Sequence, residues 1–205
     1  MVAVIDYDAG NVKSVVKAFR ALDEETILTS DPEIILKADH VVLPGVGNFG
    51  DAADKLRAFG LEETVRKVAQ SGTPLLGICV GLQLFYEGSA ESPEAAGLGF
   101  MSGRCERFDE RPGFKVPQIG WNSLHLANSG RLFEGIEEGA FVYFVHSFYA
   151  PFSDEEYVKA TTVYSNTAVA SVERGNIYAY QFHPEKSGTV GLQILRNFLK
   201  VRKES

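Results

Sequence analysis

Cys79 stands between two glycines in the segment GICVG, at the end of the apolar run PLLGIC. The run predicts a buried strand, and the residues after it predict a helix over about 80–87, so the cysteine lies in a strand-to-helix turn. Flanking glycines allow a tight turn and let other backbone pass close to the thiol. A helix N-terminus favours the negatively charged, reactive thiolate. The pattern is typical of a cysteine nucleophile, with the Val80 N–H aimed where an oxyanion would form.

Two other interpretations of this cysteine are open. Free cysteine is among the most buried residue types, so a structural role for Cys79 is the first alternative. Cys105, in GRCERF, has no comparable setting, and we interpret it as an ordinary strand residue. The second alternative is a metal site, but the chain has no C-x-x-C or H-x-x-x-H spacing. One cysteine with one histidine and one glutamate is a poor zinc set, so we expect neither a metal nor a cofactor.

His183 is the histidine best placed to act as a base for this nucleophile. It follows the aromatic segment IYAYQF and precedes Pro184, which disfavours the α conformation and keeps His183 extended. Residues i and i+2 of an extended segment face the same way, so Glu185 can reach and orient the imidazole. Cys79 and His183 would both lie at strand C-termini, where open α/β sheets bind ligands. We interpret His40 and His125 as structural. A Cys-His-Glu triad is therefore predicted.

The segment PGVG, residues 44–47, follows a third apolar run and offers another loop that can approach this site closely. An ordinary β-turn is the alternative interpretation.

The strands and helices that position these residues are predicted by alternating strand and helix signals. The pattern up to Cys79 predicts strands over 2–7, 25–30, 40–45 and 74–79, with an amphipathic helix from Asn11 and a charged helical region over about 50–70. Strands separated by helices pair in parallel, with both sheet faces covered. From Gly103 to Tyr180 short aromatic and β-branched segments predict hairpins, and a helix follows from Ser187. We therefore expect an open mixed, mostly parallel sheet flanked by helices, with an antiparallel β portion in the C-terminal half, in a single domain over 1–205.

Composition limits the classes of partner and the compartment. The 205 residues carry a net charge of −7, which argues against nucleic acid or an anionic membrane as the main partner. The N-terminus MVAVIDYDAGN has no basic region of a signal or transit peptide, and no apolar stretch approaches the roughly 20 residues that span a bilayer. Two cysteines without framework spacing fit a reducing compartment. We expect a cytoplasmic protein.

Three motifs together resemble a known family. GICVGLQ, PGVG and QFHPEKS resemble the motifs of the class I (triad) glutamine amidotransferases and stand in the relative positions found there. DYDAGN, PGVGNFG, PQIGWN and YFVHSFY are similar to those of the HisH-type glutamine amidotransferase subunits of imidazole glycerol phosphate synthases. The resemblance runs from Asp6 to about Ser187, which is nearly the whole chain. It implies a class I glutamine amidotransferase-like fold.

The resemblance also implies a reaction. Cys79 would attack the carboxamide carbon of L-glutamine, and His183, held by Glu185, would protonate the departing ammonia. A glutamyl thioester would remain for water to hydrolyse. The oxyanion would be met by the N–H groups of Val80 and, after a peptide rearrangement, Val46. The positions that match glutamine contacts in the family are Gly47, Gln83, His146, Ser147 and Phe148.

A partner follows from the same resemblance. Ammonia would pass to a (β/α)8-barrel cyclase subunit in a heterodimer, which makes imidazole glycerol phosphate and an aminoimidazole carboxamide ribotide in histidine biosynthesis. The positions that face the barrel in the family are Asn11, Trp121, Tyr143 and Lys186.

This chain departs from the family pattern at Asp8, where glycine is common, and at Phe148, where tyrosine is common. Two other functions are weighed against the glutaminase subunit. One is a non-catalytic binding or regulatory subunit, which the intact Cys79, His183 and Glu185 oppose. The other is a related cysteine hydrolase or an amidotransferase with another product, which only PQIGWN and YFVHSFY oppose.

Overall fold

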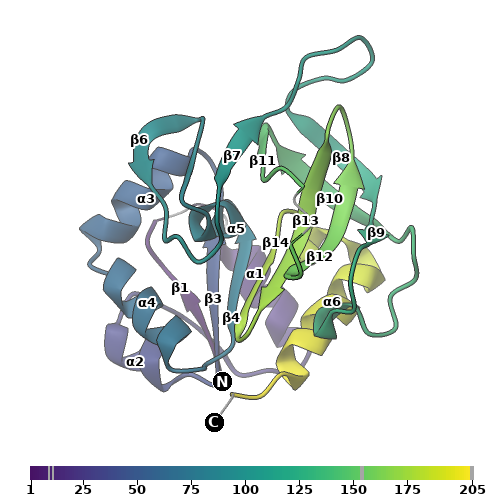
Figure 1. Ribbon diagram of the computed structural model, residues 1–205. Coiled ribbons are helices and arrows are strands. Elements are labelled where there is room, and N and C mark those ends of the chain that lie inside the picture. The colour runs from purple at the N-terminus through teal and green to yellow at the C-terminus, as the bar shows by residue number, and fades with distance from the viewer. Residues whose placement is uncertain (9, 11, 153–154, 204–205) are drawn as a thin grey trace.

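An eight-stranded sheet runs through the centre of the computed structural model, which describes residues 1–8, 10, 12–152 and 155–203 (Figure 1). The first five strands in spatial order are parallel, and the last three are antiparallel to their neighbours. The order is β2 (Thr26–Thr29), β1 (Val2–Ile5), β3 (His40–Gly45), β4 (Leu75–Cys79), β14 (Ile177–Tyr180), β13 (Thr167–Arg174), β12 (Val158–Val163) and β9 (His125–Leu126).

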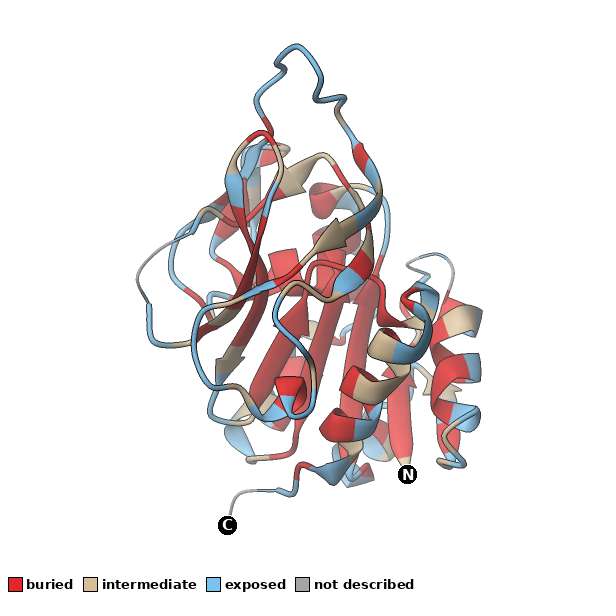
Figure 2. Ribbon diagram, turned by 90° about the vertical axis from the view of Figure 1, so that its right-hand side faces the viewer, coloured by how far each residue is buried: buried red, intermediate tan, exposed pale blue. Residues whose placement is uncertain are grey.

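Helices cover both faces of the parallel part, as right-handed crossovers require. Helices α1 (Val12–Arg20) and α6 (Gly188–Lys200) lie on one face, where the rings of Phe19 and Phe198 are 6.4 Å apart. The other face carries α2 (Pro32–Lys37), α3 (Phe49–Ala58), α4 (Glu62–Gln70) and α5 (Val80–Phe85). The strands β1, β3, β4 and β14 are buried along their length, while the helices other than the buried α5 expose their outer sides (Figure 2). No helix in the described ranges is long and apolar enough to cross a membrane.

Two smaller sheets stand beside the carboxyl ends of the parallel strands. One is an antiparallel ribbon of β8 (Gln118–Ser123) and β10 (Phe141–His146). The other has the order β11 (Phe148–Tyr149), β7 (Arg104–Arg107), β5 (Gly88–Ser89) and β6 (Ser92–Ala96). The exposed teal loop at the top of Figure 1 joins β7 to β8.

The expected fold class is confirmed, and so is the placement of Cys105 in a strand, β7. Two helical details differ. The region over 50–70 holds two helices, α3 and α4, because the chain turns between them at Gly60, whose φ of +69° ends helical geometry. Helix α2 was not predicted, although its signals are present: Asp31 caps the N–H of Glu33, and Pro32 is the first helical residue.

Candidate active site

Cys79 is the last residue of β4 and immediately precedes α5, as the sequence predicted. Its φ of 58° and ψ of −111° fall outside the regions that L-residues favour, so the turn is strained. The flanking glycines are explained by backbone that packs closely against this turn. A Cβ at Gly81 would meet the Leu43 carbonyl, and a Cβ at Gly77 would meet the backbone of Gly81. Only glycine fits at these two positions.

His183 and Glu185 form a buried pair near the carboxyl end of β14. The Nδ1 atom of His183 lies 2.8 Å from Oε1 of Glu185. Burial opposes the charged imidazolium, but the contacts with Cys79 and Glu185 outweigh burial and raise the pKa of His183. The expected contact is confirmed, and so is the extended backbone of His183, but the predicted extended geometry of the residues after it is wrong. Residues Pro184–Lys186 form a single 3-10 turn rather than an extended segment, and that turn brings the carboxylate back to the ring.

The backbone of His183 is held by the strand β10, directly at its N–H and through Ser187 at its carbonyl. Its N–H donates to the carbonyl of Tyr143 at 2.9 Å. The Ser187 hydroxyl donates to the His183 carbonyl at 2.6 Å and accepts from the N–H of Tyr143 at 3.0 Å. Sequence reasoning missed this role of Ser187, which has no signal beyond its place at the end of QFHPEKS. The histidine is therefore positioned by the strand that carries Tyr143.

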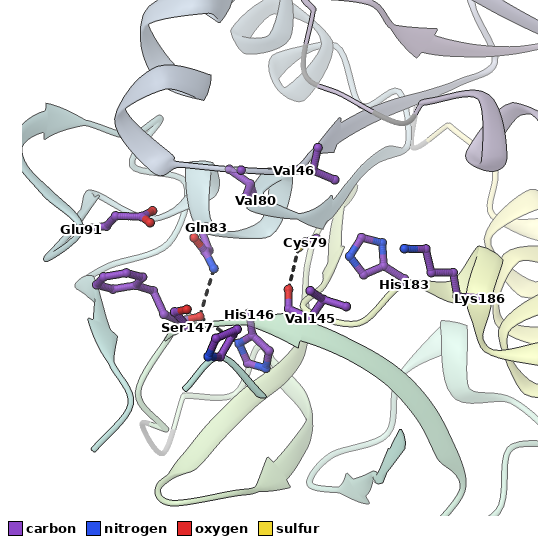
Figure 3. Close-up of a pocket in the computed structure, with 13 residues that line it drawn as sticks. Val46, Cys79, Val80, Gln83, Glu91, Val145, His146, Ser147, His183 and Lys186 are labelled. Carbon is purple, nitrogen blue, oxygen red and sulfur yellow. Dashed lines mark hydrogen bonds between the residues drawn. The ribbon is translucent and has the colours of Figure 1, made fainter. Parts of the chain in front are cut away.

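A pocket of about 390 Å³ opens over Cys79 (Figure 3). It brings together nearly all the predicted catalytic, oxyanion and substrate residues, from four separate segments of the chain. These are Val46 and Gly47; Cys79, Val80 and Gln83; His146, Ser147 and Phe148; and His183, with Lys186 at the rim. Glu185 contacts His183 but is not among the residues that line the pocket.

The PGVG segment lies directly beside the nucleophile. Gly45 pairs with Cys79 in the register of β3 and β4, so the loop begins where the cysteine is. The Tyr7 hydroxyl donates to the Pro44 carbonyl at 2.6 Å and fixes the base of the loop. Gly47 has a φ of +90°, which favours glycine, and turns the chain towards α3. The segment is thus the end of a buried strand, and it continues into the pocket wall.

Three glutamine-contact candidates are linked by hydrogen bonds. Gln83 donates through Nε2 to the Phe148 carbonyl at 3.1 Å, and the same carbonyl lies 2.9 Å from Nδ1 of His146. The other ring nitrogen of His146 is 3.1 Å from the side-chain amide of Gln118. Burial lowers the pKa of His146 to about 4, so its ring is neutral at pH 7. Both ring nitrogens are occupied within the protein. Phe148 contributes its backbone, which its departure from tyrosine leaves intact.

Glu91, Pro117 and Val145 also line the pocket and were not predicted. Figure 3 places the Glu91 carboxylate at the end of the pocket opposite Lys186. Its Oε2 accepts from the N–H of Phe49 at 2.8 Å, which anchors it at the start of α3. Glu91 lies in the turn between β5 and β6, and no motif pattern marked it in the sequence.

Of the residues expected to face a partner, Lys186 lines the pocket, whereas Trp121 and Tyr143 lie on the β8–β10 ribbon. Trp121 and Tyr143 are paired across β8 and β10, and their rings are 6.0 Å apart on the outer side of the ribbon. The Lys186 ammonium stands 5.8 Å from the Tyr143 ring. Asn11 is outside the described residues. Asp8 has a φ of 61°, which suits the glycine common at this position, and Lys55 binds both its carbonyl and its carboxylate at 2.8 Å.

The arrangement of the site suits covalent catalysis by a cysteine nucleophile. Within the described ranges, no three His, Cys, Asp or Glu side chains are grouped so that they could hold a metal ion. The arrangement instead joins a strained cysteine, a histidine with a raised pKa and an orienting carboxylate, which can form and resolve an acyl-enzyme.

Comparison with protein families decides the assignment of the chain. The family model of the class-I glutamine amidotransferases matches residues 3–201. The chain belongs to this family.

Curated relatives place this amidotransferase among subunits of one enzyme. It is 47% identical to the imidazole glycerol phosphate synthase subunit HisH of Synechococcus sp. (strain JA-3-3Ab), over 97% of this chain and 92% of that one. It is 48% identical to the subunit HisH of Methanothermobacter thermautotrophicus, over 98% of both chains. The predicted family is confirmed, and the chain is a glutamine amidotransferase with glutaminase activity.

Solved structures agree on the fold. A crystal structure of a glutamine amidotransferase superimposes with a TM-score of 0.75 at 22% identity, covering 98% of each chain. The glutaminase domain of Trypanosoma brucei CTPS with bound acivicin gives a TM-score of 0.69 at 16% identity, over 100% of this chain and 94% of that one. At such low sequence identities, the similarity shows that this amidotransferase shares the fold and shows nothing more.

Proposed function

We propose that Cys79, His183 and Glu185 are the catalytic triad of this amidotransferase. The observation that carries the proposal is that the strained cysteine and the His183–Glu185 pair meet at one pocket. Cys79 Sγ attacks the carboxamide carbon of L-glutamine, and the amide C–N bond breaks as His183 gives its proton to the leaving nitrogen. Ammonia leaves and a glutamyl thioester remains. Water, deprotonated by His183, then attacks the thioester and releases glutamate.

Backbone N–H groups stabilise the oxyanion in this mechanism. Val80 begins α5 directly after the nucleophile, so its N–H faces the carbon under attack. The second donor is the N–H of Val46, whose loop adjoins Cys79 through the Gly45 pairing. A peptide rearrangement in this loop completes the oxyanion hole.

The pocket walls suit a free amino acid. Gly47, Gln83, His146, Ser147 and Phe148 surround the path from Cys79 towards Glu91. The Glu91 carboxylate, held in place by the Phe49 N–H, has the charge that attracts an α-ammonium group. The amide group of glutamine then lies at Cys79 and its charged end lies near Glu91.

We further propose that the partner is a cyclase with a (β/α)8-barrel fold and that the two chains form a heterodimer. Neither nucleic acid nor a membrane is a partner in this proposal. The outer side of the β8–β10 ribbon exposes large apolar side chains: Ile119 is 63% exposed, Trp121 55% and Phe141 58%. Such a concentration of apolar surface marks an interaction site. Ammonia passes to the cyclase, which makes imidazole glycerol phosphate and an aminoimidazole carboxamide ribotide. The whole chain acts as one amidotransferase domain. Its two cysteines are both free thiols, which suits a location in the reducing cytoplasm.

Reconstitution with the cyclase subunit tests the triad and the partner together. The complex should make product from glutamine and from ammonium salts, while Cys79→Ala should lose only the glutamine-dependent route. Product from glutamine at the normal rate in Cys79→Ala would end the nucleophile assignment. A cyclase that neither binds the chain nor uses its ammonia would favour an amidotransferase with another product.

The partner surface has its own test. Trp121→Ala should weaken the cyclase complex at least tenfold, because exposed tryptophans at interface centres are frequent hot spots. Phe59→Ala is the matched control, since Phe59 is 49% exposed but lies at the end of α3, away from the ribbon. Titration of each variant with labelled cyclase measures the affinity. Equal affinities for the two variants would place the interface elsewhere.

A further inference from the structure

Gln181 is a residue of QFHPEKS to which the sequence assigned no role, and it is completely buried. It directly follows β14, where Tyr180 pairs with Ile78 of β4. The parallel register therefore puts Gln181 level with Cys79 on the neighbouring strand. Its Nε2 atom lies 3.7 Å from the Cys79 Sγ atom. A buried amide thus contacts the reacting sulfur from the side.

The direction of this amide is fixed by a chain of hydrogen bonds that starts at a backbone carbonyl. The Phe148 carbonyl can only accept, so Gln83 turns its NH2 group towards it. The same Nε2 of Gln83 lies 3.1 Å from Oε1 of Gln181. Because that nitrogen donates, Gln181 presents its oxygen to Gln83. The NH2 group of Gln181 is left facing the sulfur.

Besides His183, two polar groups lie near the sulfur, and they favour different protonation states. The Val145 carbonyl, 3.9 Å from Sγ, can accept a hydrogen bond from the thiol but offers nothing to a thiolate. The Gln181 amide is a donor, and a donor favours the charged form of sulfur. Both Gln83 and Gln181 are buried, so little water competes with this contact.

We propose that Gln181 is a further catalytic residue, whose amide N–H donates to Cys79 Sγ and stabilises the thiolate as the thiol proton passes to His183. Gln83 has a second task beside substrate contact, because it locks the Gln181 amide in the donating direction. The backbone at Phe148, in the wall of the substrate pocket, sets that direction. This inference rests on the proposed role of Cys79 as the nucleophile.

Alkylation of Cys79 by iodoacetamide tests the proposal without glutamine or a partner. The rate is followed by mass spectrometry of the Cys79 peptide across a range of pH. Gln181→Met keeps the length of the side chain and removes the donor. Gln181→Glu keeps the hydrogen bond to Gln83 but places an acceptor at the sulfur. Gln193→Met, on α6, is the matched control.

The midpoint of the alkylation profile should rise by about one pH unit in Gln181→Met, so that alkylation below the midpoint is about tenfold slower. The rise should be larger in Gln181→Glu and absent in Gln193→Met. Thermal unfolding verifies the fold, and Gln181→Glu provides the test if Gln181→Met does not fold. An unchanged profile in a folded Gln181 variant would overturn the proposal, even if glutamine hydrolysis is lost. Failure of the proposed function is distinguishable: the wild type would then release no ammonia from glutamine, while the alkylation shift could still be measured.

Discussion

The Nδ1 atom of His183 lies 2.8 Å from Oε1 of Glu185, and the two side chains are only 6% and 4% exposed. Within the described part of the chain, the other carboxylate oxygen of Glu185 is buried without a hydrogen-bond partner. The hydrogen bond of the Glu185 carboxylate is therefore directed to His183. It holds the Nδ1–H tautomer and leaves Nε2 for the proton transfer with Cys79 that the proposed triad requires.

Glu185→Gln should reduce kcat for glutamine hydrolysis by about 10²–10⁴-fold, because an amide does not stabilise the imidazolium as a carboxylate does. The pKa of His183 should fall, since Glu185 is one of the two contacts that raise it. Steady-state kinetics and a pH–rate profile measure both effects. Glu94→Gln, on the exposed side of β6, serves as the control. Wild-type kcat in Glu185→Gln would remove Glu185 from the triad.

Cys79→Gly should be more stable than Cys79→Ala, by about 1 kcal/mol, because glycine adopts the positive φ at this turn without strain. Urea unfolding of both variants gives the difference, and both should lack glutaminase activity. At Cys105, inside β7, the order should reverse, because glycine weakens a strand interior. If alanine is the more stable residue at both positions, the turn at Cys79 stores no strain.

Gly10→Ala should reduce glutaminase activity by about 10²-fold, because misplacing catalytic groups by about an ångström has effects of this size. A Cβ at Gly10 would collide with the Val46 side chain and displace the proposed oxyanion loop. Gly113→Ala is a matched control: its φ of +89° equals the +88° of Gly10 within a degree, but its Cβ would meet open space. Both variants should be slightly destabilised, yet only Gly10→Ala should lose activity in a glutaminase assay. Equal activities would separate Val46 from the oxyanion site.

The free energy of unfolding should fall as the pH is lowered from 6.5 to 4, partly because of His146. Burial lowers the pKa of His146 to about 4 in the folded protein, whereas the unfolded chain binds this proton near pH 6.5. The unfolded state therefore binds more protons in this window, and His146 contributes a loss on the order of 3 kcal/mol across it. Urea unfolding at several pH values should show a shallower slope for His146→Gln than for the wild type. If the slope of His146→Gln equals that of the wild type, His146 does not contribute to this loss of stability.

The proposed nucleophile and its proposed base could be predicted because their signals are local. The glycines around Cys79 and the proline after His183 constrain the backbone of their own segments, and Glu185 is only two residues away from the histidine. The alternation of apolar runs and amphipathic segments gave the sheet and its helices for the same reason. Even here, the 3-10 turn at Pro184–Lys186 shows that a correct contact can rest on a different local geometry.

Contacts between distant segments could not be predicted from such patterns. Gln181 reaches Cys79 because β14 crosses over to lie beside β4, and the Glu91 carboxylate enters the pocket because its turn packs against the start of α3. Strand order and register depend on the burial of the whole chain, since one shifted register would move every side chain to the opposite face. By itself the sequence therefore predicted the proposed triad and determined the class of fold. Only the tertiary structure decided which residues surround the sulfur, because it alone sets which strand ends become neighbours.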